Sequence, residues 1–241
     1  MSKVRLDKAC IEKMETRTRA KDAIQEGRVF VNGKVIIKAS YLVDEDDVIE
    51  IQSKENDFVS RAGQKLQGAF DEFHIQIENQ VVLDIGASTG GFTDVCLRHG
   101  AKKVYALDVG HLQLSEKLEK DARVVKYEGK NAREIVPDWF DESIDFLCMD
   151  VSFISCKTIL KVVFEQLNVK HMAILVKPQF ECGPEALNKH GVLRNDRLRQ
   201  KIIEGVKAFL LTQYQHVYTM DSILSGRSGN QETILYAFEK R

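Results

Sequence analysis

Short apolar runs and helix-like stretches alternate along the chain from residue 81 onward. The apolar runs suit strands buried in a sheet, and residues 92–98 and 198–211 have helical periodicity, the second stretch opened by Asn195 as a helix N-cap. Strands that alternate with helices form a mostly parallel sheet with helices on both faces. The sequence therefore predicts an α/β fold with strands at residues 81–85, 104–109, 124–127, 144–150, 173–176, 217–224 and 233–238.

The last two predicted strands are joined by a short loop, residues 225–231. A parallel pair needs a crossover of roughly a dozen residues or more, so this pair is predicted to be antiparallel. A parallel sheet closed by an antiparallel pair is typical of methyltransferases and unusual in dinucleotide dehydrogenases.

The first predicted strand contains Asp84 near its end and leads through a glycine-rich turn into the helix at 92–98. The turn reads Gly86-Ala87-Ser88-Thr89-Gly90-Gly91-Phe92, and its spacing differs from the G-x-G-x-x-G of pyrophosphate-binding loops. Glycine permits a positive φ and, lacking Cβ, lets a ligand approach the backbone. By itself the turn suits an S-adenosylmethionine (SAM) loop, a dinucleotide site or a plain tight turn. The antiparallel closing pair favours SAM.

Polar and charged residues gather where the predicted strands end, the edge at which open α/β sheets bind ligands. Asp150 and Lys177 each follow an apolar run directly, and a half-buried charge is costly unless it is paired or functional. A salt bridge joining two strands explains this pair equally well. Asp108 is placed to accept hydrogen bonds from ribose hydroxyls. The residues expected at this edge are Asp84, Asp108, Asn131, Asp150, Lys177 and Glu232.

The first 52 residues have a different pattern and predict a separate small α+β domain. Residues 5–14 and 16–26 read as short helices, with Gly27 as a stop signal. Asn32-Gly33 between apolar residues predicts a type I′ hairpin over 29–36, and a further strand follows at 48–51. A polar stretch within 53–59 is the expected linker to a second domain at 60–241.

Composition excludes some classes of protein. Among the 241 residues no apolar run is long enough to span a membrane, and the N-terminus lacks the apolar core of a secretory signal. The five cysteines include no C-x-x-C pair and read as reduced thiols of a cytoplasmic protein. Residues 1–40 carry ten Lys and Arg against five Asp and Glu. That basic surface suits a polyanion partner or an ordinary solvated helix face.

Two resemblances sharpen this picture, and the first concerns the basic domain. Arg5-Leu6-Asp7, the segment from Arg17 to Gly27, and Val29-x-Val31-Asn32-Gly33-Lys34 resemble the S-four-like RNA-binding domain. The resemblance implies that a basic face contacts phosphates of structured RNA, which gives affinity with little sequence reading. The residues implied are Arg5, Arg17, Arg19, Lys21 and Lys34.

The second resemblance covers nearly the whole chain. Six ordered motifs, which begin at Ser60, Asp84, Asp108, Asp150, Lys177 and Gly229, are similar to those of the hemolysin A (TlyA) family. Its members are ribosomal-RNA 2′-O-methyltransferases with an S-four-like domain and an FtsJ-type catalytic domain. The departures are local: Ala62 replaces a common Gly, and the residues after Gly110 differ.

That resemblance implies roles for the residues at the sheet edge. SAM would be bound by Asp84, Gly86, Ser88, Thr89, Gly90, Gly91, Phe92, Asp108, Asn131 and Asp150. The catalytic tetrad would be Lys65, Asp150, Lys177 and Glu232. Lys177 would deprotonate the ribose hydroxyl or stabilise its alkoxide, while the carboxylates orient the lysines. The implied target is a 2′-OH, taken to be of a cytidine, in ribosomal RNA or ribosomal subunits. No metal and no membrane are implied, and oligomeric state is not predicted.

The same residues bear on other reactions and on other classes of protein. No Pro-Cys supplies the nucleophile typical of pyrimidine-carbon methylation, and Asp150-Val151-Ser152-Phe153 replaces the Asn/Asp-Pro-Pro-aromatic motif of amine methyltransferases. Ribose oxygen is therefore the expected target. The alternatives of another class are a cytolysin, because the family carries a hemolysin label, and a non-catalytic RNA-binding ribosome-assembly factor.

Overall fold

The computed structural model describes residues 3–14, 17–52, 58–226 and 228–241, and the chain divides into two compact units, Met1–Arg61 and Ala62–Arg241. Three sequence predictions fall partly outside the described residues: the linker at 53–57, the helix start at Thr16, and Arg227 in the closing loop. Within the described ranges no helix is long and apolar enough to cross a membrane.

The smaller unit packs three short helices against small antiparallel sheets. Strand β2 lies between β3 and β5, and β1 pairs with β4. The Asn32-Gly33 turn has positive φ at both residues, 51° and 76°, as a type I′ hairpin requires. The elements are β1 Val4–Arg5, α1 Leu6–Ala9, α2 Ile11–Met14, α3 Arg17–Gln25, β2 Val29–Val31, β3 Lys34–Val35, β4 Leu42–Val43 and β5 Ile49–Ile51.

The helix predicted over residues 5–14 differs from the observed one at its start and middle. Arg5 is extended and pairs with Leu42, so the helix begins at Leu6. A turn at Cys10 separates α1 from α2, although backbone hydrogen bonds from Cys10 to Leu6 and from Met14 to Cys10 continue the helical pattern. Leu6, Cys10 and Ile24 fill the core of this unit.

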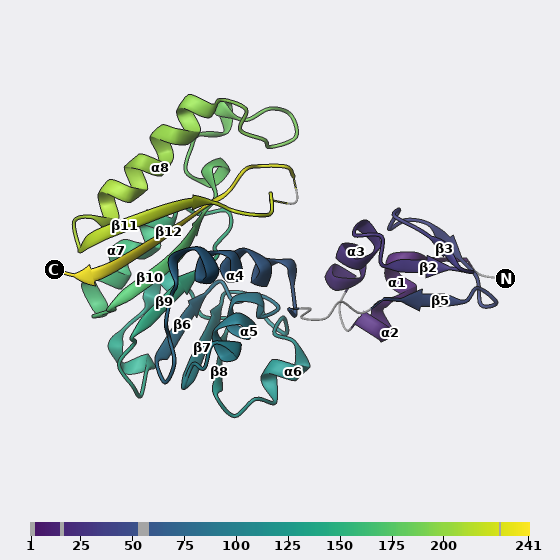
Figure 1. The fold of residues 1–241 in the computed structure, drawn as a ribbon, viewed down its shortest axis with the longest axis horizontal. Helices are drawn as coiled ribbons and strands as arrows, with labels where there is room; N and C mark the ends of the chain where they lie inside the picture. Colours follow the sequence, from purple (N-terminus) through teal and green to yellow (C-terminus); the bar gives the residue numbers. More distant parts are fainter. Residues whose placement is uncertain (1–2, 15–16, 53–57, 227) are drawn as a thin grey trace. The chain divides into compact units, whose positions relative to one another are not determined.

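The larger unit is built on a seven-stranded sheet with the order β11-β12-β10-β9-β6-β7-β8 (Figure 1). The five neighbouring strands β10, β9, β6, β7 and β8 are parallel to one another. Strand β12 is antiparallel to its neighbours β10 and β11, which confirms the predicted antiparallel closing pair. The strands are β6 Val81–Ile85, β7 Lys103–Asp108, β8 Val124–Glu128, β9 Phe146–Met149, β10 His171–Val176, β11 Tyr214–Asp221 and β12 Thr233–Lys240.

Helices cover both faces of this sheet. On one face Ile159 and Val163 of α7 and Val206 of α8 join the main hydrophobic core, and Figure 1 shows α4 and α5 on the other face. The helices are α4 Arg61–Phe73, α5 Gly91–Arg98, α6 Glu116–Glu119, α7 Cys156–Gln166 and α8 Asp196–Leu210, with 3-10 turns η1 Ala132–Glu134, η2 Pro137–Trp139, η3 Pro178–Phe180 and η4 Pro184–Ala186.

The chain order creates a switch point in the middle of the sheet. From β6 the chain adds β7 and β8 on one side, and then crosses over to add β9 and β10 on the other. Loops that leave β6 and β9 therefore diverge at their carboxyl ends and open a crevice there.

Candidate active site

A cavity of about 750 Å³ lies at the carboxyl ends of β6, β7 and β9. Its volume is in the range of sites for cofactor-sized ligands. Apolar walls come from Ile85, Leu107, Val151 and Ile159. Five of the predicted cofactor residues line it, namely Gly86, Ser88, Asp108, Asn131 and Asp150.

The glycines of the turn serve the packing of the chain itself. Gly86 has φ +84°, and a Cβ there would lie 2.4 Å from the backbone oxygen of Asp150. Gly90 has φ +93°, and a Cβ there would lie 2.2 Å from Cδ1 of Leu118. Ligand approach stays a prediction for these glycines, and their missing side chains also make room for Asp150, which follows β9, and for Leu118 of α6. Gly90 together with Thr89, Gly91 and Phe92 is not among the cavity-lining residues.

Asp84 is fully buried beneath the turn and does not line the cavity either. Its Oδ2 accepts a 2.7 Å hydrogen bond from Thr93 Oγ1 of α5, which fastens the strand to the helix. Within the described residues its Oδ1 has no hydrogen-bond partner. Burial is the main cause that raises the pKa of Asp84 to about 7, and the nearby charge of Asp150 adds to it.

Asp108 joins two loops at the cavity wall. One carboxylate oxygen accepts the N–H of Ser88 at 2.8 Å, and the other accepts the N–H of Gly110 at 2.7 Å. Asn131 accepts the N–H of Arg133 through its side-chain oxygen and thereby caps η1. Each oxygen of Asp108 has a further lone pair, so its carboxylate can still accept a ligand hydroxyl or amine. Asn131 Oδ1 also accepts from Arg133 Nε at 3.3 Å, which leaves its side-chain NH₂ to donate to a ligand.

The four predicted tetrad residues form two ion pairs. Lys65 Nζ of α4 lies 2.5 Å from Glu232 Oε2, and both residues are buried. Lys177 Nζ lies 2.6 Å from Asp150 Oδ1, with side chains only 12% and 15% exposed. Both lysines are therefore held by carboxylates and shielded from bulk water.

Strand register brings the two pairs to one end of the sheet. The antiparallel register matches Val176 of β10 with Thr233 of β12. Lys177 and Glu232 are the next residue beyond this match on each strand, so they leave the sheet side by side. Asp150 follows β9, which is parallel to β10.

Ser152 contacts the Asp150–Lys177 pair and Phe153 follows it in the chain, and the sequence predicted no role for either residue. Ser152 Oγ accepts a 2.8 Å hydrogen bond from Lys177 Nζ. Phe153 has φ +64°, is 90% exposed and faces Phe180 with ring centroids 4.9 Å apart. Ser152 and Phe153 belong to the motif that begins at Asp150, and this motif could have indicated both as functional residues. A large apolar ring left in water at the cavity mouth is available for stacking.

Glu181 connects the loop that follows β9 with the loop that follows β10. Its Oε2 accepts from Ser155 Oγ at 2.6 Å and its Oε1 accepts from the N–H of Cys156 at 2.6 Å. These donors stand at the N-terminus of α7, so the carboxylate caps the helix from a distant part of the chain. The pairing spans 25 residues, which no local pattern in the sequence reveals.

In the smaller unit the predicted RNA-binding arginines are organised by Asp7. This fully buried carboxylate lies 3.1 Å from Arg5 Nε and 2.9 Å from Arg17 Nη2. The Arg5 guanidinium, with Arg17, holds the pKa of Asp7 at about 2. The two arginine side chains are still 42% and 45% exposed, so they are fixed in direction yet available to a ligand. Of the other predicted residues, Arg19 and Lys21 are half-buried and Lys34 is exposed.

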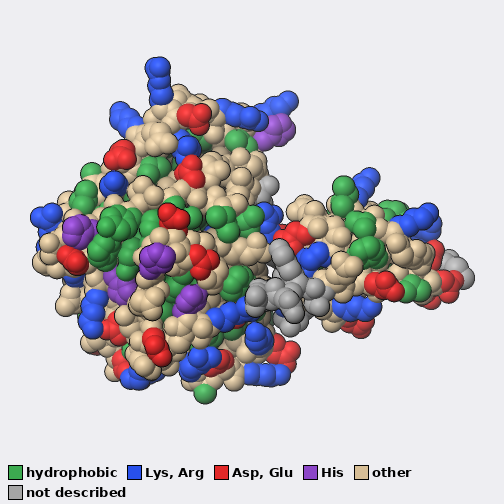
Figure 2. Space-filling view, viewed as in Figure 1, with side chains coloured by type: hydrophobic (Ala, Val, Ile, Leu, Met, Phe, Trp, Pro, Cys, Tyr) green, Lys and Arg blue, Asp and Glu red, His purple; other side chains and the backbone are tan. Residues whose placement is uncertain are grey.

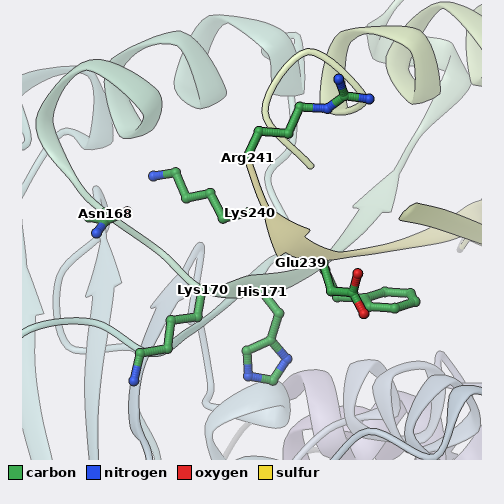
Figure 3. A pocket seen from close by; sticks show the side chains of 7 residues that line it. Asn168, Lys170, His171, Glu239, Lys240 and Arg241 are labelled. Carbon is green, nitrogen blue, oxygen red and sulfur yellow. The ribbon is translucent and has the colours of Figure 1, made fainter. Parts of the chain in front are cut away.

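A second hollow of about 570 Å³ lies at the opposite edge of the sheet, near the start of β10. His171 stands in it, but both of its ring nitrogens are within hydrogen-bond distance of partners, Tyr236 Oη at 3.0 Å and Gln80 Oε1 at 2.7 Å. Figure 3 shows the side chains of Lys170, Lys240 and Arg241 pointing in different directions. These side chains do not point toward one common position, as the side chains of a reaction site do.

The fold and the cavity at its switch point define a methyltransferase. The model of the FtsJ-like methyltransferase family matches residues 58–238, and the S4 domain model matches residues 4–49. The chain therefore belongs to the FtsJ-like methyltransferase family and carries an S4 domain at its N-terminus, as the sequence resemblances indicated.

Relatives resemble the chain over most of its length. Hemolysin A of Brachyspira hyodysenteriae is 45% identical over 92% of the chain and 93% of that protein. The 16S/23S rRNA (cytidine-2′-O)-methyltransferase TlyA of Mycobacterium tuberculosis is 36% identical over 92% of the chain and 84% of that protein. A solved structure from Streptococcus thermophilus that carries a hemolysin name is 36% identical, with a TM-score of 0.76 over 99% of the chain and 90% of that chain.

Proposed function

We propose that this enzyme transfers the methyl group of SAM to a ribose 2′-hydroxyl of ribosomal RNA, with a cytidine as the target nucleoside. The observation that carries the proposal is the pair of lysine–carboxylate contacts, Lys177–Asp150 and Lys65–Glu232, beside the cavity. The relatives named as rRNA cytidine-2′-O-methyltransferases support the substrate.

The cavity residues fit SAM. The cofactor carries a sulfonium and an ammonium cation, a ribose diol and an adenine. The carboxylates of Asp108 and Asp150 suit the cations and hydroxyls, and Ile85, Leu107 and Ile159 suit the apolar ring. When bound, SAM supplies an activated methyl group, so the protein has to provide only position and proton handling.

Lys177 is the residue assigned to the ribose oxygen. The 2′-oxygen must lose its proton as it bonds to the methyl carbon. Lys177 would accept that proton as the neutral amine, and the ammonium so formed would stay paired with Asp150. Asp150 and Ser152 fix the position of Nζ at 2.6 and 2.8 Å. The Lys65–Glu232 pair adds a second cation without leaving an unpaired buried charge.

The S4 domain supplies RNA affinity in this proposal. Arg5 and Arg17, held by Asp7, present cations whose contacts to phosphate need no base recognition. A domain of this kind holds the RNA, while the methyltransferase unit selects the ribose.

Labelled-methyl transfer tests the proposal. Purified enzyme is incubated with labelled SAM and, in separate reactions, with ribosomal RNA and with isolated ribosomal subunits, and the methylated position is mapped. Transfer to a ribose 2′-oxygen is expected. Transfer to a base, or absence of transfer from an enzyme that binds SAM in a calorimeter, would overturn the proposal. A protein that neither binds SAM nor transfers a methyl group would favour the RNA-binding assembly factor.

A further inference from the structure

A short hairpin on the methyltransferase unit, residues 187–194, has an ordered backbone. Leu187 and Leu193 form a bridge, and the N–H of Asn188 donates to the carbonyl of Val192 at 3.0 Å. The side-chain oxygen of Asn188 accepts from the N–H groups of His190 and Val192 at 2.9 and 3.0 Å. These bonds leave the loop little freedom to change shape.

The hairpin is fastened to the segment that carries Glu232. Asn230 is 3% exposed, and its side chain accepts from the N–H of Leu193 at 2.9 Å and donates to the carbonyl of Gly191 at 3.0 Å. Glu232 follows two residues later, directly before β12. The hairpin therefore has a fixed position relative to the reaction site.

The hairpin presents cations that the described residues do not neutralise. Lys189 and Arg194 are exposed, as is Arg197 in the first turn of α8, and the described residues offer none of these side chains a hydrogen bond or an ion pair. His190 beside them is also exposed. No acidic residue occurs between 186 and 195. Asp196, just beyond, lies 3.7 Å from Arg199. Figure 2 shows blue and purple side chains gathered over the end of this loop.

Other cations of the same unit are mostly paired. Lys103, Lys126 and Arg123 each lie within 3.0 Å of a carboxylate. Unpaired cations held on a rigid support suit a polyanion. When such cations bind phosphates, the counterions of the polyanion are released, and this release provides the affinity.

We propose that the hairpin 187–194, with Arg197, contacts the RNA phosphates that flank the target ribose. The inference rests on the proposed function and extends it, because it places part of the RNA affinity in the methyltransferase unit itself. A ribose at Lys177 continues on both sides into phosphate, and α8 packs against η3, the turn that follows Lys177. The hairpin is positioned to orient the strand as it leaves the reaction site.

The test compares two variants that lose equal charge. One carries Lys189→Gln and Arg194→Gln, and its control carries Lys161→Gln and Lys207→Gln, two lysines on α7 and α8 for which the described residues provide no ion pair. Binding to a ribosomal RNA fragment is measured by filter retention at several salt concentrations, and methyl transfer is measured in parallel. Thermal unfolding verifies that both variants are folded.

The hairpin variant is expected to bind RNA roughly tenfold more weakly, with a salt slope smaller by about 1.4, because two phosphate contacts are lost. Its SAM affinity should equal that of the wild type. Equal losses in the control variant, or unchanged binding and slope in the hairpin variant, would overturn the inference. Binding is read without methyl transfer, so a wild type that binds RNA but transfers no methyl group defeats only the proposed function.

Discussion

Lys177 is the side chain to which the proposed function assigns the proton of the ribose hydroxyl. Its Nζ is held between Asp150 and Ser152, in a pocket of side chains that excludes most water. It is absent from the lining of the cofactor cavity, although its partner Asp150 is part of that lining. A substitution of Lys177 should therefore affect the reaction without removing a residue that lines the cavity.

Lys177→Ala should abolish methyl transfer and leave SAM affinity nearly unchanged. General acid–base groups contribute about 10²- to 10⁴-fold to a rate, so single-turnover transfer should fall by at least the lower figure. Calorimetry measures SAM binding. Ser152→Ala, which removes only one acceptor of Nζ, should show a smaller loss. If Lys177→Ala lost SAM binding instead, its catalytic assignment would be withdrawn.

Glu181 should act through the Asp150–Lys177 pair rather than on substrate. Glu181→Ala removes the cap of α7, which should cost about 1 kcal/mol of stability and lower kcat with little change in either KM. Glu181→Gln keeps an oxygen for the N–H of Cys156, so it should restore most of kcat. A pH–rate profile of unchanged shape in both variants would agree with positioning, whereas loss of one limb would make Glu181 a proton-transfer group.

Asp84 predicts a pH dependence of stability. Its pKa is about 7 when folded, against an ordinary value of 3.8, so between these pH values the folded state binds the extra proton. Protonation of Asp84 therefore adds to the free energy of unfolding at low pH. This contribution is lost as the pH rises toward about 7. Asp84→Asn retains an acceptor for Thr93 and has no proton to lose.

The measurement is urea unfolding of both proteins across this pH range. The stability of Asp84→Asn relative to wild type should grow from about pH 4 to pH 7 and then level off, by up to about 4 kcal/mol. Because other titrating groups are common to both proteins, they cancel in the difference. A difference that stays constant with pH would show that Asp84 is ionised in the folded protein.

Among the elements, the turn after β6 depends most on a single residue. Gly86→Ala places a Cβ against the backbone of β9, in addition to the strain of a positive φ. Gly191→Ala carries similar strain, φ +72°, but meets no atom within 4 Å and serves as the control. The control should cost about 1 to 2 kcal/mol, and Gly86→Ala should cost more and impair methyl transfer. Equal denaturant midpoints for Gly86→Ala and Gly191→Ala would show that the backbone of Asp150 moves aside with no further loss of stability.

The elements that could be predicted from sequence are those whose signals are local. The parallel strands are continuous apolar runs, and the short loop at 225–231 required an antiparallel pair. Helix α7 was missed because its N-terminal cap comes from Glu181, and β1 and β4 because each has only two residues. Lys65 and Glu232 stand 167 residues apart, so only the family resemblance, and no periodicity, brought them together.

In the whole molecule, the proposed RNA contacts lie in both units of the chain. Arg17 and Arg19 belong to the S4 domain, and the hairpin 187–194 belongs to the methyltransferase unit. Contacts at separate sites without shared partners should add in free energy. Combining Arg17→Ala and Arg19→Ala with the hairpin variant should therefore weaken RNA binding by the product of the two separate factors.

Arg17→Ala with Arg19→Ala should by itself weaken RNA binding and flatten the salt dependence. Asp7 keeps Arg5 as a partner in this variant, and thermal unfolding verifies that the unit stays folded. The salt slope should fall by about 1.4 for two phosphate contacts, whereas Lys38→Ala, an exposed lysine of the same unit, should change it less. Once RNA is saturating, kcat should be that of the wild type because Lys177 and its partners are untouched. An unchanged slope would remove this face from the RNA site and leave the methyltransferase unit to bind RNA by itself.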